Sequence, residues 1–407
     1  IGSGPIIIGQ AAEFDYSGTQ ACRALKAEGI ETVLLNSNPA TIMTDPDVAD
    51  HVYIEPMTLE VVERILEIEK PDSVLPNLGG QMGLNLSMEL ARSGYLDRTG
   101  IRLLACKPET IDRAEDRELF KETMEKLHQP IIPSEVVETL QDALACADRI
   151  GYPVIVRPAF TMGGTGGGIV YNEEELRKVS QRGLAASLVH QILIEESVIG
   201  WEELEVEVVR DAKGKKISIC FIENIDPMGV HTGDSFCSAP MLTISQEVQD
   251  KLEQQAHAIV ESIGVIGGTN VQFAHDPKTD RIIIIEINPR TSRSSALASK
   301  ATGFPIAYVS ALLAAGLTLD EIPYWKEGTL DKYKPSGDYV VVKFARWAFE
   351  KFKGSQDKLG TQMKAVGEVM SIGKNYKEAL QKAIRSLELP VKLAGSLGMR
   401  REEICGL

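Results

Sequence analysis

The sequence predicts an α/β protein with more than one domain, beginning with a doubly wound sheet covered by helices. Through residues 1–108, short segments rich in Val, Ile and Leu alternate with segments of helical periodicity, which is the pattern of parallel βαβ units. The length of 407 residues allows two or three domains. The strongest single strand signal comes later, at residues 282–285, where four isoleucines follow one another.

The elements of the first domain follow from this alternation. Residues 5–9 and 32–36 are predicted as parallel strands, and the segment from Ser17 to Glu28 between them as a helix that ends at Gly29. The pattern continues with a helix (Leu59–Glu69), a strand (Ser73–Pro76) and a further helix (Met82–Ser93). We therefore predict a doubly wound α/β domain over residues 1–108.

A dinucleotide-binding loop is a first functional hypothesis for this domain, because Gly2, Gly4 and Gly9 lie close together. The GxGxxG spacing, however, requires glycine at position 7, which is isoleucine, and Pro5 has no N–H to offer a phosphate. The second predicted strand also ends in Asn36 where an acidic residue would hold a ribose. The sequence therefore argues against NAD binding.

A glycine-rich segment follows the next strand signal. The predicted strand Tyr152–Arg157 ends in an arginine, and five of the six residues from 163 to 168 are glycine. Backbone N–H groups of such a loop can close over phosphates, although the Lys-Ser/Thr of a P-loop is missing. Because a strand at residues 169–171 follows directly, we predict a hairpin lid over phosphates, with a mobile turn as the alternative.

The other predicted elements are one long amphipathic helix before the lid, an antiparallel arrangement after it, and an α/β segment near the end. They are the helix Pro108–His128, the strand Gln191–Glu196, the hairpin strands Glu203–Arg210 and Lys216–Glu223, the helix Val248–Ile263, the strand Thr269–Ala274, the strand Asp338–Lys343 and the helix Tyr376–Leu387. His231, in a glycine-bearing polar loop, is equally interpretable as a ligand or as a structural histidine.

The end of the isoleucine strand carries the strongest chemical signal. Side chains alternate along a strand, so Glu286, Asn288 and Arg290 are expected on one side, and Pro289 ends the ladder there. Carboxylate and amide oxygens suit Mg²⁺, and the arginine can hold an anion beside the metal. Gln272, on the strand expected next to this one, is a third oxygen ligand candidate. The alternative is a strand end with a solvated ion pair.

Composition narrows the function classes. The formal net charge of −15 argues against a general nucleic-acid binder. No apolar run reaches the length of a membrane span, and the six cysteines and six histidines show neither CxxC nor HExxH spacing, which argues against zinc. We expect a cytoplasmic protein with reduced, mostly buried thiols.

Five segments of the chain are similar to the large chain of carbamoyl phosphate synthetase, and the similarity runs from residue 1 to about residue 388. These segments are Gly9–Gly18, Asn38–Asp45, Phe160–Gly168, Met228–Ser235 and Asn288–Gly303. The forms at Thr161–Gly168 and Ser292–Ser299 resemble the N-terminal half of that large chain, which forms carboxyphosphate.

The resemblance implies an α/β protein with a Rossmann-like pre-ATP-grasp domain, an ATP-grasp fold and a C-terminal α/β extension. The implied domains are residues 1–108 for the pre-ATP-grasp domain and 109–315 for the ATP-grasp domain, with a lid at about 120–190. Residues 316–388 would complete the carboxyphosphate unit, and residues 389–407 would begin a following segment or form a tail.

The resemblance also implies roles for residues at matching positions. ATP would be bound by Arg117, Arg157, Gly163, Gly164, Glu196, Val198, Glu203, Gly229, Val230, His231, Gln272 and Glu286. Gln272, Glu286 and Asn288 would hold two Mg²⁺ or Mn²⁺ ions, and Arg290, the catalytic candidate, would hold bicarbonate. Asn224, Asp226 and Ser235 fit a monovalent-cation site for K⁺.

The implied function is ATP-dependent phosphorylation of bicarbonate to carboxyphosphate and its amination to carbamate, in arginine and pyrimidine biosynthesis. Bicarbonate and ammonia are the expected substrates besides ATP, and a glutaminase small subunit and a carbamate-phosphorylating half are the expected partners. Neither nucleic acid nor membrane is expected. Two alternatives stay open: another ATP-grasp carboxylate ligase, and a nucleotide-binding subunit without catalysis.

Overall fold

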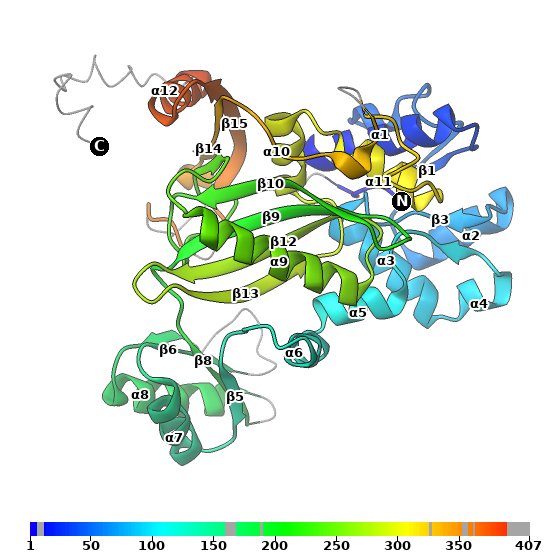
Figure 1. The fold of residues 1–407 in the computed structure, drawn as a ribbon. Helices are drawn as coiled ribbons and strands as arrows, with labels where there is room; N and C mark the ends of the chain where they lie inside the picture. Colours follow the sequence, from blue (N-terminus) through cyan, green and yellow to red (C-terminus); the bar gives the residue numbers. More distant parts are fainter. Residues whose placement is uncertain are drawn as a thin grey trace.

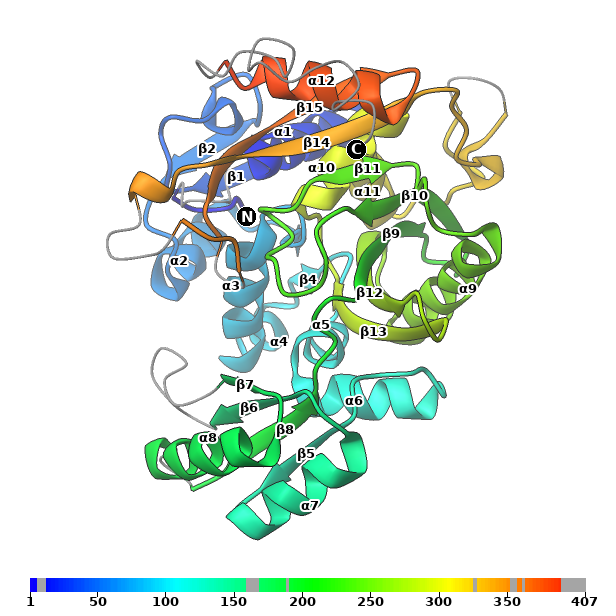
Figure 2. The same ribbon diagram turned by 90° about the vertical axis from the view of Figure 1, so that its left-hand side faces the viewer.

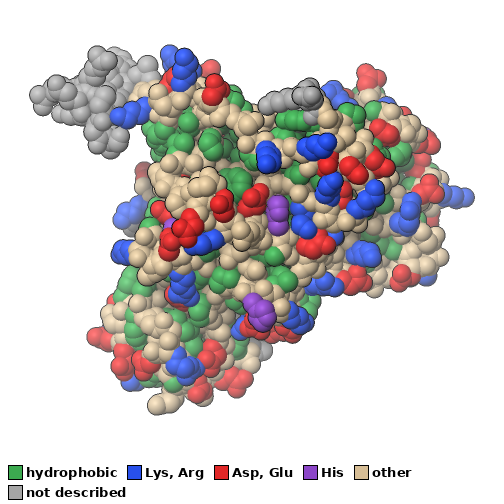
Figure 3. Space-filling view, viewed as in Figure 1, with side chains coloured by type: hydrophobic (Ala, Val, Ile, Leu, Met, Phe, Trp, Pro, Cys, Tyr) green, Lys and Arg blue, Asp and Glu red, His purple; other side chains and the backbone are tan. Residues whose placement is uncertain are grey.

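The structure is a computed structural model that describes residues 1–5, 12–158, 168–187, 190–324, 328–351, 357–360 and 363–388. Figures 1 and 2 show an N-terminal α/β unit, a small sheet flanked by helices, and a large sheet of seven strands. In Figure 1 the N-terminal unit, in blue and cyan, lies to the right of the large sheet, and the small sheet lies below it. Figure 3 shows that acidic and basic side chains are interspersed over this face.

The N-terminal unit combines parallel strand pairs with helices. Strand β1 pairs with β2 and β3 with β4, both in parallel. The elements are α1 (Ala12–Ala27), β1 (Val33–Asn36), η1 (Ile42–Thr44), β2 (His51–Ile54), α2 (Leu59–Glu69), β3 (Ser73–Val74), α3 (Gly80–Arg92), α4 (Tyr95–Thr99) and β4 (Arg102–Leu103). Parallel strands connected through helices confirm the predicted α/β class.

Helix α2 has the predicted bounds, because Thr58 caps its first turn and Lys70 leaves the helical region in a left-handed conformation. Helix α1, in contrast, begins at Ala12, before the predicted start at Ser17. The Ser17 hydroxyl donates to the Glu13 carbonyl at 2.8 Å inside the helix, so it does not act as an N-cap. Of the first predicted strand, residues 6–9 lie outside the described residues.

The single helix predicted from Pro108 to His128 is wrong in one respect, because the structure has two helices there. Helix α5 (Pro108–Glu115) ends before Asp116, and α6 (Arg117–Lys126) begins after it. The Asp116 carboxylate accepts hydrogen bonds from the backbone N–H groups of Glu118 and Leu119 at 3.0 Å. An aspartate that caps a new helix competes with continuation of the old one.

The small sheet is antiparallel in the order β5-β8-β6-β7. It consists of β5 (Ser134–Val137), β6 (Val154–Pro158), β7 (Gly168–Val170) and β8 (Ile192–Glu196), with α7 (Leu140–Ile150) and α8 (Glu173–Ala186) packed on it. Val154 pairs with Val170 across β6 and β7, which confirms the predicted hairpin. The glycines from 163 to 167 lie outside the described residues.

The large sheet has the order β13-β12-β9-β10-β11-β14-β15, with every described pairing antiparallel. Its strands are β9 (Glu202–Arg210), β10 (Lys216–Asn224), β11 (Cys237–Ala239), β12 (Gly267–Asp276), β13 (Arg281–Asn288), β14 (Val340–Trp347) and β15 (Ala365–Gly373). The helices around it are α9 (Gln246–Ile263), α10 (Arg293–Thr302), α11 (Ile306–Ala314) and α12 (Tyr376–Ser386), with short turns η3 (Leu330–Lys332) and η4 (Phe349–Lys351).

The two faces of this sheet differ in chemistry. One face buries apolar side chains of β9 and β12, such as Val206 and Phe273, in a core shared with α9. The opposite face carries polar side chains of the same strands, and the N-terminus of α10 contributes serines to it. Alternation along each strand produces the two faces, and the polar face carries the candidate site.

Within the described residues, no single helix is long and apolar enough to cross a membrane. Helices α10 and α11 reach the length and apolar composition of a membrane span only when they are taken together, and the chain bends by 111° between them.

Candidate active site

Three predicted ligands lie together because the strands that carry them are in register. Gln272 on β12 pairs directly with Glu286 on β13. Two residues further along the same two strands, Asn270 pairs with Asn288. Directly paired residues in an antiparallel sheet project to the same face, so the structure brings Gln272, Glu286 and Asn288 onto one polar surface.

The end of β13 shows the expected alternation. Ile287 is buried, whereas Glu286 is exposed and Asn288 is half-buried. The Asn288 amide donates to the Glu286 carboxylate at 3.0 Å. Among the described residues, no group of three or more His, Cys, Asp and Glu side chains is arranged for a metal ion. One carboxylate with two amide oxygens fits a divalent cation that takes its other ligands from phosphate and water.

Arg290 follows directly on this strand and is held by neutral groups. Its Nε donates to the Gln81 side-chain oxygen at 3.2 Å, and its Nη1 donates to the Thr291 carbonyl at 3.2 Å. Within the described part of the chain, Arg290 forms no ion pair. Burial lowers the pKa of Arg290. A half-buried guanidinium held by neutral acceptors is suited to bind a small anion.

A row of carboxylates on β9 contains, besides the predicted Glu203, two acids that the sequence analysis missed, Glu205 and Glu207. Glu203, Glu205 and Glu207 are all at most 5% exposed. Glu205 accepts from Asn224 at 2.8 Å, Asn270 at 2.9 Å and Ser294 at 2.5 Å. The alternation of Glu with Leu and Val would usually indicate a solvent-facing edge. Here it places acids on the polar face, next to the predicted ligands.

Glu207 is held in the same network. Its carboxylate accepts from the Asn270 amide at 2.8 Å and from the Ser295 hydroxyl at 3.0 Å. Burial, and then the charge of Glu205, raise the pKa of Glu207 to about 7. Hydrogen bonds from α10 and β12 thus fix this part of the polar face.

Glu203 and Asn224 lie opposite each other on β9 and β10. Glu203 Oε2 and Asn224 Oδ1 are both buried and have no hydrogen-bond partner. Burial, and then the charges of Glu205 and Glu286, raise the pKa of Glu203 to about 8. Two buried oxygens without donors fit a bound cation, since leaving them unpaired is costly.

The other two monovalent-cation candidates adjoin this pair. The Ser235 hydroxyl accepts from the Asp226 backbone N–H at 3.3 Å. The Asp226 carboxylate accepts from the Phe236 backbone N–H at 3.0 Å. Asp226 also contributes to the raised pKa of Glu203. The structure therefore groups Asn224, Asp226 and Ser235 with Glu203.

Val198 belongs to an apolar cluster at one end of the polar face. It packs in a core with Ala274 and Ile283, with Trp201 and Met228 at the edge. Glu196, just before it, forms a two-pronged ion pair with Arg281 at 2.6 and 2.7 Å. The Glu196 side chain is therefore already engaged, which leaves backbone groups of this segment for a ligand, as the resemblance implies.

The loop with Gly229, Val230 and His231 crosses near this cluster. Gly229 has φ of +110°, and a side chain there would contact Ile199, so glycine fits this position best. The His231 backbone N–H donates to the Gly360 carbonyl at 2.8 Å, and its Nδ1 accepts from the Gly233 N–H at 3.0 Å. Burial, followed by the charge of Arg293, lowers the pKa of His231. A neutral, locally bonded histidine favours the structural interpretation of its ring.

The predicted phosphate ligands outside the large sheet are less closely connected to the polar face. Arg157 on β6 is about half exposed and pairs with Glu195 at 2.6 Å. Arg117 is exposed at the start of α6, and no described contact connects it to the polar face. Gly163 and Gly164 lie outside the described residues. The structure thus brings the predicted residues of the large sheet together on the polar face, and no described contact adds these four residues to that group.

The raised pKa values of Glu203 and Glu207 predict how stability depends on pH. Both carboxyls have folded-state pKa values above the ordinary 4.5. Between about pH 4.5 and pH 8 the folded chain therefore binds more protons than the unfolded chain, and its stability falls as the pH rises. The slope is up to about 1.4 kcal/mol per pH unit for each group. Urea unfolding from pH 5 to pH 8, without ligand, measures it.

The variant Glu203→Gln should reduce this dependence of stability on pH by up to the contribution of one titrating group, about 1.4 kcal/mol per pH unit. Gln254→Ala, at an exposed uncharged position of α9, is the control and should leave the slope unchanged. A slope in the Glu203→Gln chain equal to that of the parent would mean that Glu203 is already ionised in the folded protein.

Three family models match the chain. Residues 116–322 match the model described as carbamoyl-phosphate synthase L chain, ATP binding domain. Residues 1–113 match the carbamoyl phosphate synthase preATP-grasp domain. Residues 368–403 match the carbamoyl-phosphate synthetase large chain, oligomerisation domain, and this match includes most of the tail that the sequence analysis left unassigned.

Proteins called carbamoyl phosphate synthase large chain are similar to this chain in sequence. The one from Thermotoga sp. (strain RQ2) is 59% identical over 391 residues, which are 96% of this chain and 36% of the relative. The one from Archaeoglobus fulgidus is 58% identical over 392 residues, with the same coverage. The chain thus spans about a third of the length of these relatives.

Solved structures of biotin carboxylases share the fold. The Campylobacter jejuni biotin carboxylase aligns with a TM-score of 0.63 at 19% identity, covering 84% of this chain and 75% of that one. The biotin carboxylase domain of Hydrogenobacter thermophilus 2-oxoglutarate carboxylase aligns with a TM-score of 0.67 at 17% identity, covering 91% and 88%. These likenesses establish the ATP-grasp architecture alone. By its matches to two large-chain models over residues 1–113 and 116–322, the chain belongs to the carbamoyl phosphate synthase large-chain family.

Proposed function

We propose that this chain phosphorylates bicarbonate with ATP to give carboxyphosphate, and then aminates carboxyphosphate to carbamate. The observation that carries the proposal is the position of Arg290. This half-buried guanidinium, bonded to neutral acceptors, directly follows the strand on which Glu286 and Asn288 offer oxygen ligands. An anion site beside a divalent-cation site is what phosphoryl transfer to bicarbonate requires.

Each group of residues has a distinct role in this proposal. Gln272, Glu286 and Asn288 would hold two Mg²⁺ or Mn²⁺ ions, and Arg290 would orient bicarbonate. When bound, the ions supply charge neutralisation and Lewis acidity at the phosphates. The apolar cluster around Val198 fits the flat base of ATP, and Glu203 fits its ribose. Arg117 and Arg157 would hold the phosphates, and Gly163 and Gly164 would belong to the lid that closes over them.

The first step forms a bond between a bicarbonate oxygen and the γ-phosphorus and breaks the bond from that phosphorus to the ADP oxygen. Ammonia then attacks the carbon of carboxyphosphate, phosphate leaves, and the nitrogen loses a proton to give carbamate. Arg290 aligns the attacking oxygen, and alignment with charge neutralisation is the main contribution a protein makes to such a transfer. Excluding water from the site protects an intermediate that hydrolyses readily.

The buried oxygens of Glu203 and Asn224 support K⁺ as an additional cofactor. Both atoms lack hydrogen-bond donors, and Asp226 and Ser235 lie beside them. A monovalent cation among these oxygens would satisfy Asn224 and favour the ionised form of Glu203. Replacing K⁺ by tetramethylammonium should therefore reduce the reaction rate without removing ATP binding.

The partners and location are part of the proposal as well. The relatives are named large chains, which supports a small-chain partner, here a glutaminase that supplies ammonia. Their greater length supports a second half that phosphorylates carbamate. The cysteines in the described residues are free and buried, at positions 22, 106, 146, 220 and 237, which supports a reducing, cytoplasmic location.

The test is ADP release by the 407-residue chain with Mg²⁺ and K⁺, with and without bicarbonate. We expect bicarbonate to raise the rate and ammonia to raise it further, with carbamate as product. A rate that responds to biotin as acceptor but not to ammonia would indicate another carboxylate ligase of this fold. Bound ATP without any turnover would indicate a nucleotide-binding subunit.

A further inference from the structure

The main chain on both sides of Arg290 is bonded to residues outside the large sheet. The thiol of Cys106, a buried residue just after β4, donates to the Pro289 carbonyl at 3.2 Å. The Thr291 backbone N–H and hydroxyl both donate to the Asn77 carbonyl, at 3.1 and 3.3 Å. Residues 77 and 106 belong to the N-terminal unit and its continuation after β4. This unit therefore fixes the place at which Arg290 leaves the sheet.

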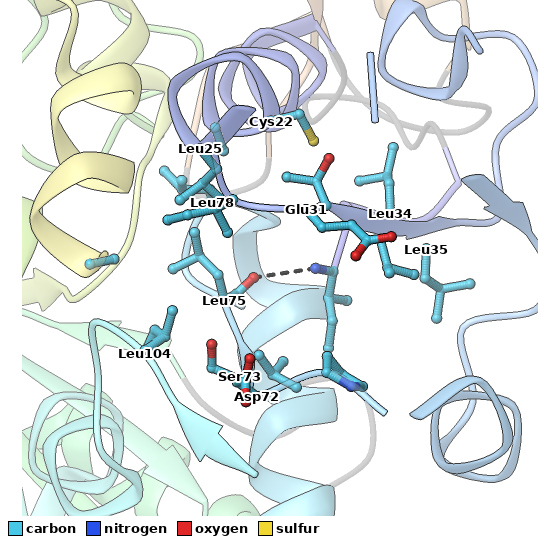
Figure 4. A pocket seen from close by; sticks show the side chains of 18 of the residues that line it. Cys22, Leu25, Glu31, Leu34, Leu35, Asp72, Ser73, Leu75, Leu78 and Leu104 are labelled. Carbon is cyan, nitrogen blue, oxygen red and sulfur yellow. Dashed lines mark hydrogen bonds between the residues drawn. The ribbon is translucent and has the colours of Figure 1, made fainter. Parts of the chain in front are cut away.

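The loop that contains Asn77 is itself held by burial. It follows β3 and leads into α3. Leu75 and Leu78 of this loop line the cavity shown in Figure 4, within the N-terminal unit. Leu78 is only 2% exposed and belongs to a core that also contains Leu297 of α10. Since packed interiors deform little, this burial holds the loop in place beside the segment of Arg290.

Gln81, in the first turn of α3, contacts the Arg290 side chain directly. Arg290 Nε donates to Gln81 Oε1 at 3.2 Å. The Gln81 amide nitrogen donates to the two Glu115 carboxylate oxygens at 2.8 and 3.0 Å, and to the Asn85 side-chain oxygen at 3.1 Å. A flipped amide would turn its N–H groups toward the Arg290 N–H and its oxygen toward the carboxylate. Glu115 therefore fixes the amide with its oxygen toward Arg290.

This contact leaves the charge of Arg290 available to a ligand. An arginine side chain has five N–H groups. The described contacts occupy one on Nε, toward Gln81, and one on Nη1, toward the Thr291 carbonyl. Both acceptors are neutral, and Gln81 stands between the guanidinium and the Glu115 carboxylate. The guanidinium thus keeps its charge and its remaining N–H groups for a planar anion that accepts two hydrogen bonds.

We propose that Gln81 is a positioning residue of the bicarbonate site. Its neutral amide oxygen holds the Arg290 guanidinium in place without cancelling its charge, and Glu115, the last residue of α5, fixes the orientation of the amide. The proposal rests on the proposed function, in which Arg290 orients bicarbonate. It gives the N-terminal unit a direct part in the reaction, because Gln81 comes from α3 of that unit.

Gln81→Met tests the hydrogen bond, because methionine keeps the length of the side chain but has no amide oxygen. We expect the apparent KM for bicarbonate to rise by about 10-fold or more, as loss of a hydrogen bond to a charged group implies. The KM for ATP should stay within about twofold, since the interaction lost is made at the anion site. ADP release by the 407-residue chain, with bicarbonate and ATP varied in turn, measures both values.

The matched control is Gln254→Met, at an exposed position of α9, which should leave both KM values unchanged. A parent-like KM for bicarbonate in Gln81→Met would overturn the proposal. KM values for ATP and bicarbonate that rise together, with a lower melting temperature, would also overturn it, because they would show a structural role alone.

Gln81→Glu tests the neutrality of the acceptor. This variant keeps a side chain of the same length with an oxygen toward Arg290, but the oxygen carries negative charge. Bicarbonate would then compete with a carboxylate for the guanidinium, and its KM should again rise by about 10-fold or more. Gln254→Glu, which adds the same charge on α9, should have no effect. A bicarbonate KM in Gln81→Glu equal to that of the parent would contradict the proposal.

A measurement that needs no turnover separates this proposal from the proposed function. The Arg290 Nε–H signal can be followed by NMR in a chain labelled with ¹⁵N-arginine, and its loss in Arg290→Lys assigns it. Its hydrogen exchange should be about 10-fold or more faster in Gln81→Met than in the parent, and unchanged in Gln254→Met. Absence of bicarbonate-stimulated ADP release in the parent would refute the proposed function. Equal exchange in the parent and Gln81→Met would refute the role of Gln81, whatever the activity.

Discussion

Replacing Arg290 by alanine is expected to abolish the bicarbonate-stimulated ATPase while ATP still binds. The guanidinium is half-buried at the end of the ligand strand, and its described partners are the neutral groups of Gln81 and Thr291. In our account its positive charge serves the bicarbonate anion in the transition state. Loss of one such contact typically costs roughly 10²–10³-fold in rate. ADP release at saturating bicarbonate, with ATP affinity measured in parallel, tests this expectation.

Arg92→Ala is the matched control for this variant. Arg92 lies at the end of α3, is 70% exposed at its side chain and pairs with Asp112 at 3.1 Å, so its removal should change neither rate nor affinity measurably. Arg290→Lys keeps the charge but loses the planar fork, and we expect partial activity from it. Full bicarbonate stimulation in Arg290→Ala would remove Arg290 from the mechanism.

The second large effect is expected for Glu286→Ala. Glu286 is the one carboxylate among the three proposed divalent-cation ligands, so its removal takes away the only formal negative charge of that set. We expect the metal-dependent ATPase to fall by at least roughly 10²-fold, since a bound metal contributes several kcal/mol to phosphoryl transfer. Mn²⁺ binding, followed by electron paramagnetic resonance in the presence of ATP, should weaken in parallel.

The stability of the Glu286→Ala chain should change little, because the side chain is exposed. Glu247→Ala is the control: Glu247 is also exposed, and it lies in the first turn of α9, which covers the opposite face of the same sheet. Parent-like Mn²⁺ affinity in Glu286→Ala, together with parent-like activity, would show that the divalent cations are held elsewhere.

The fold followed from the sequence wherever a local signal agreed with tertiary packing. The predicted bounds of α2 are confirmed, and in the structure Thr58 and Lys70 mark its two ends. The hairpin of β9 and β10 follows from alternation on both sides of a turn. The break between α5 and α6 was missed because Asp116 acts through a side-chain cap. A polar residue in a helical pattern does not by itself reveal that role.

Part of the site could also be predicted, because there too a local sequence signal agreed with the tertiary packing. Strand parity placed Glu286 and Asn288 on one side, the expected pairing of the two strands placed Gln272 beside them, and the register of β12 and β13 bears out these positions. The buried acids Glu205 and Glu207 were not recognised, since only contacts with Asn270, Ser294 and Ser295, distant in sequence, make their burial tolerable. Gln81, which accepts a hydrogen bond from Arg290, lies on helix α3 of the N-terminal unit, and no local pattern connects the two residues.

The most direct test of the central claim follows oxygen from bicarbonate into phosphate. The 407-residue chain would be supplied with freshly dissolved ¹⁸O-bicarbonate, ATP, Mg²⁺ and K⁺, and the released phosphate analysed by mass spectrometry. If a bicarbonate oxygen attacks the γ-phosphorus, each phosphate formed through carboxyphosphate carries one ¹⁸O derived from bicarbonate. Phosphate that takes its new oxygen from water alone, despite bicarbonate-stimulated hydrolysis, would contradict the account.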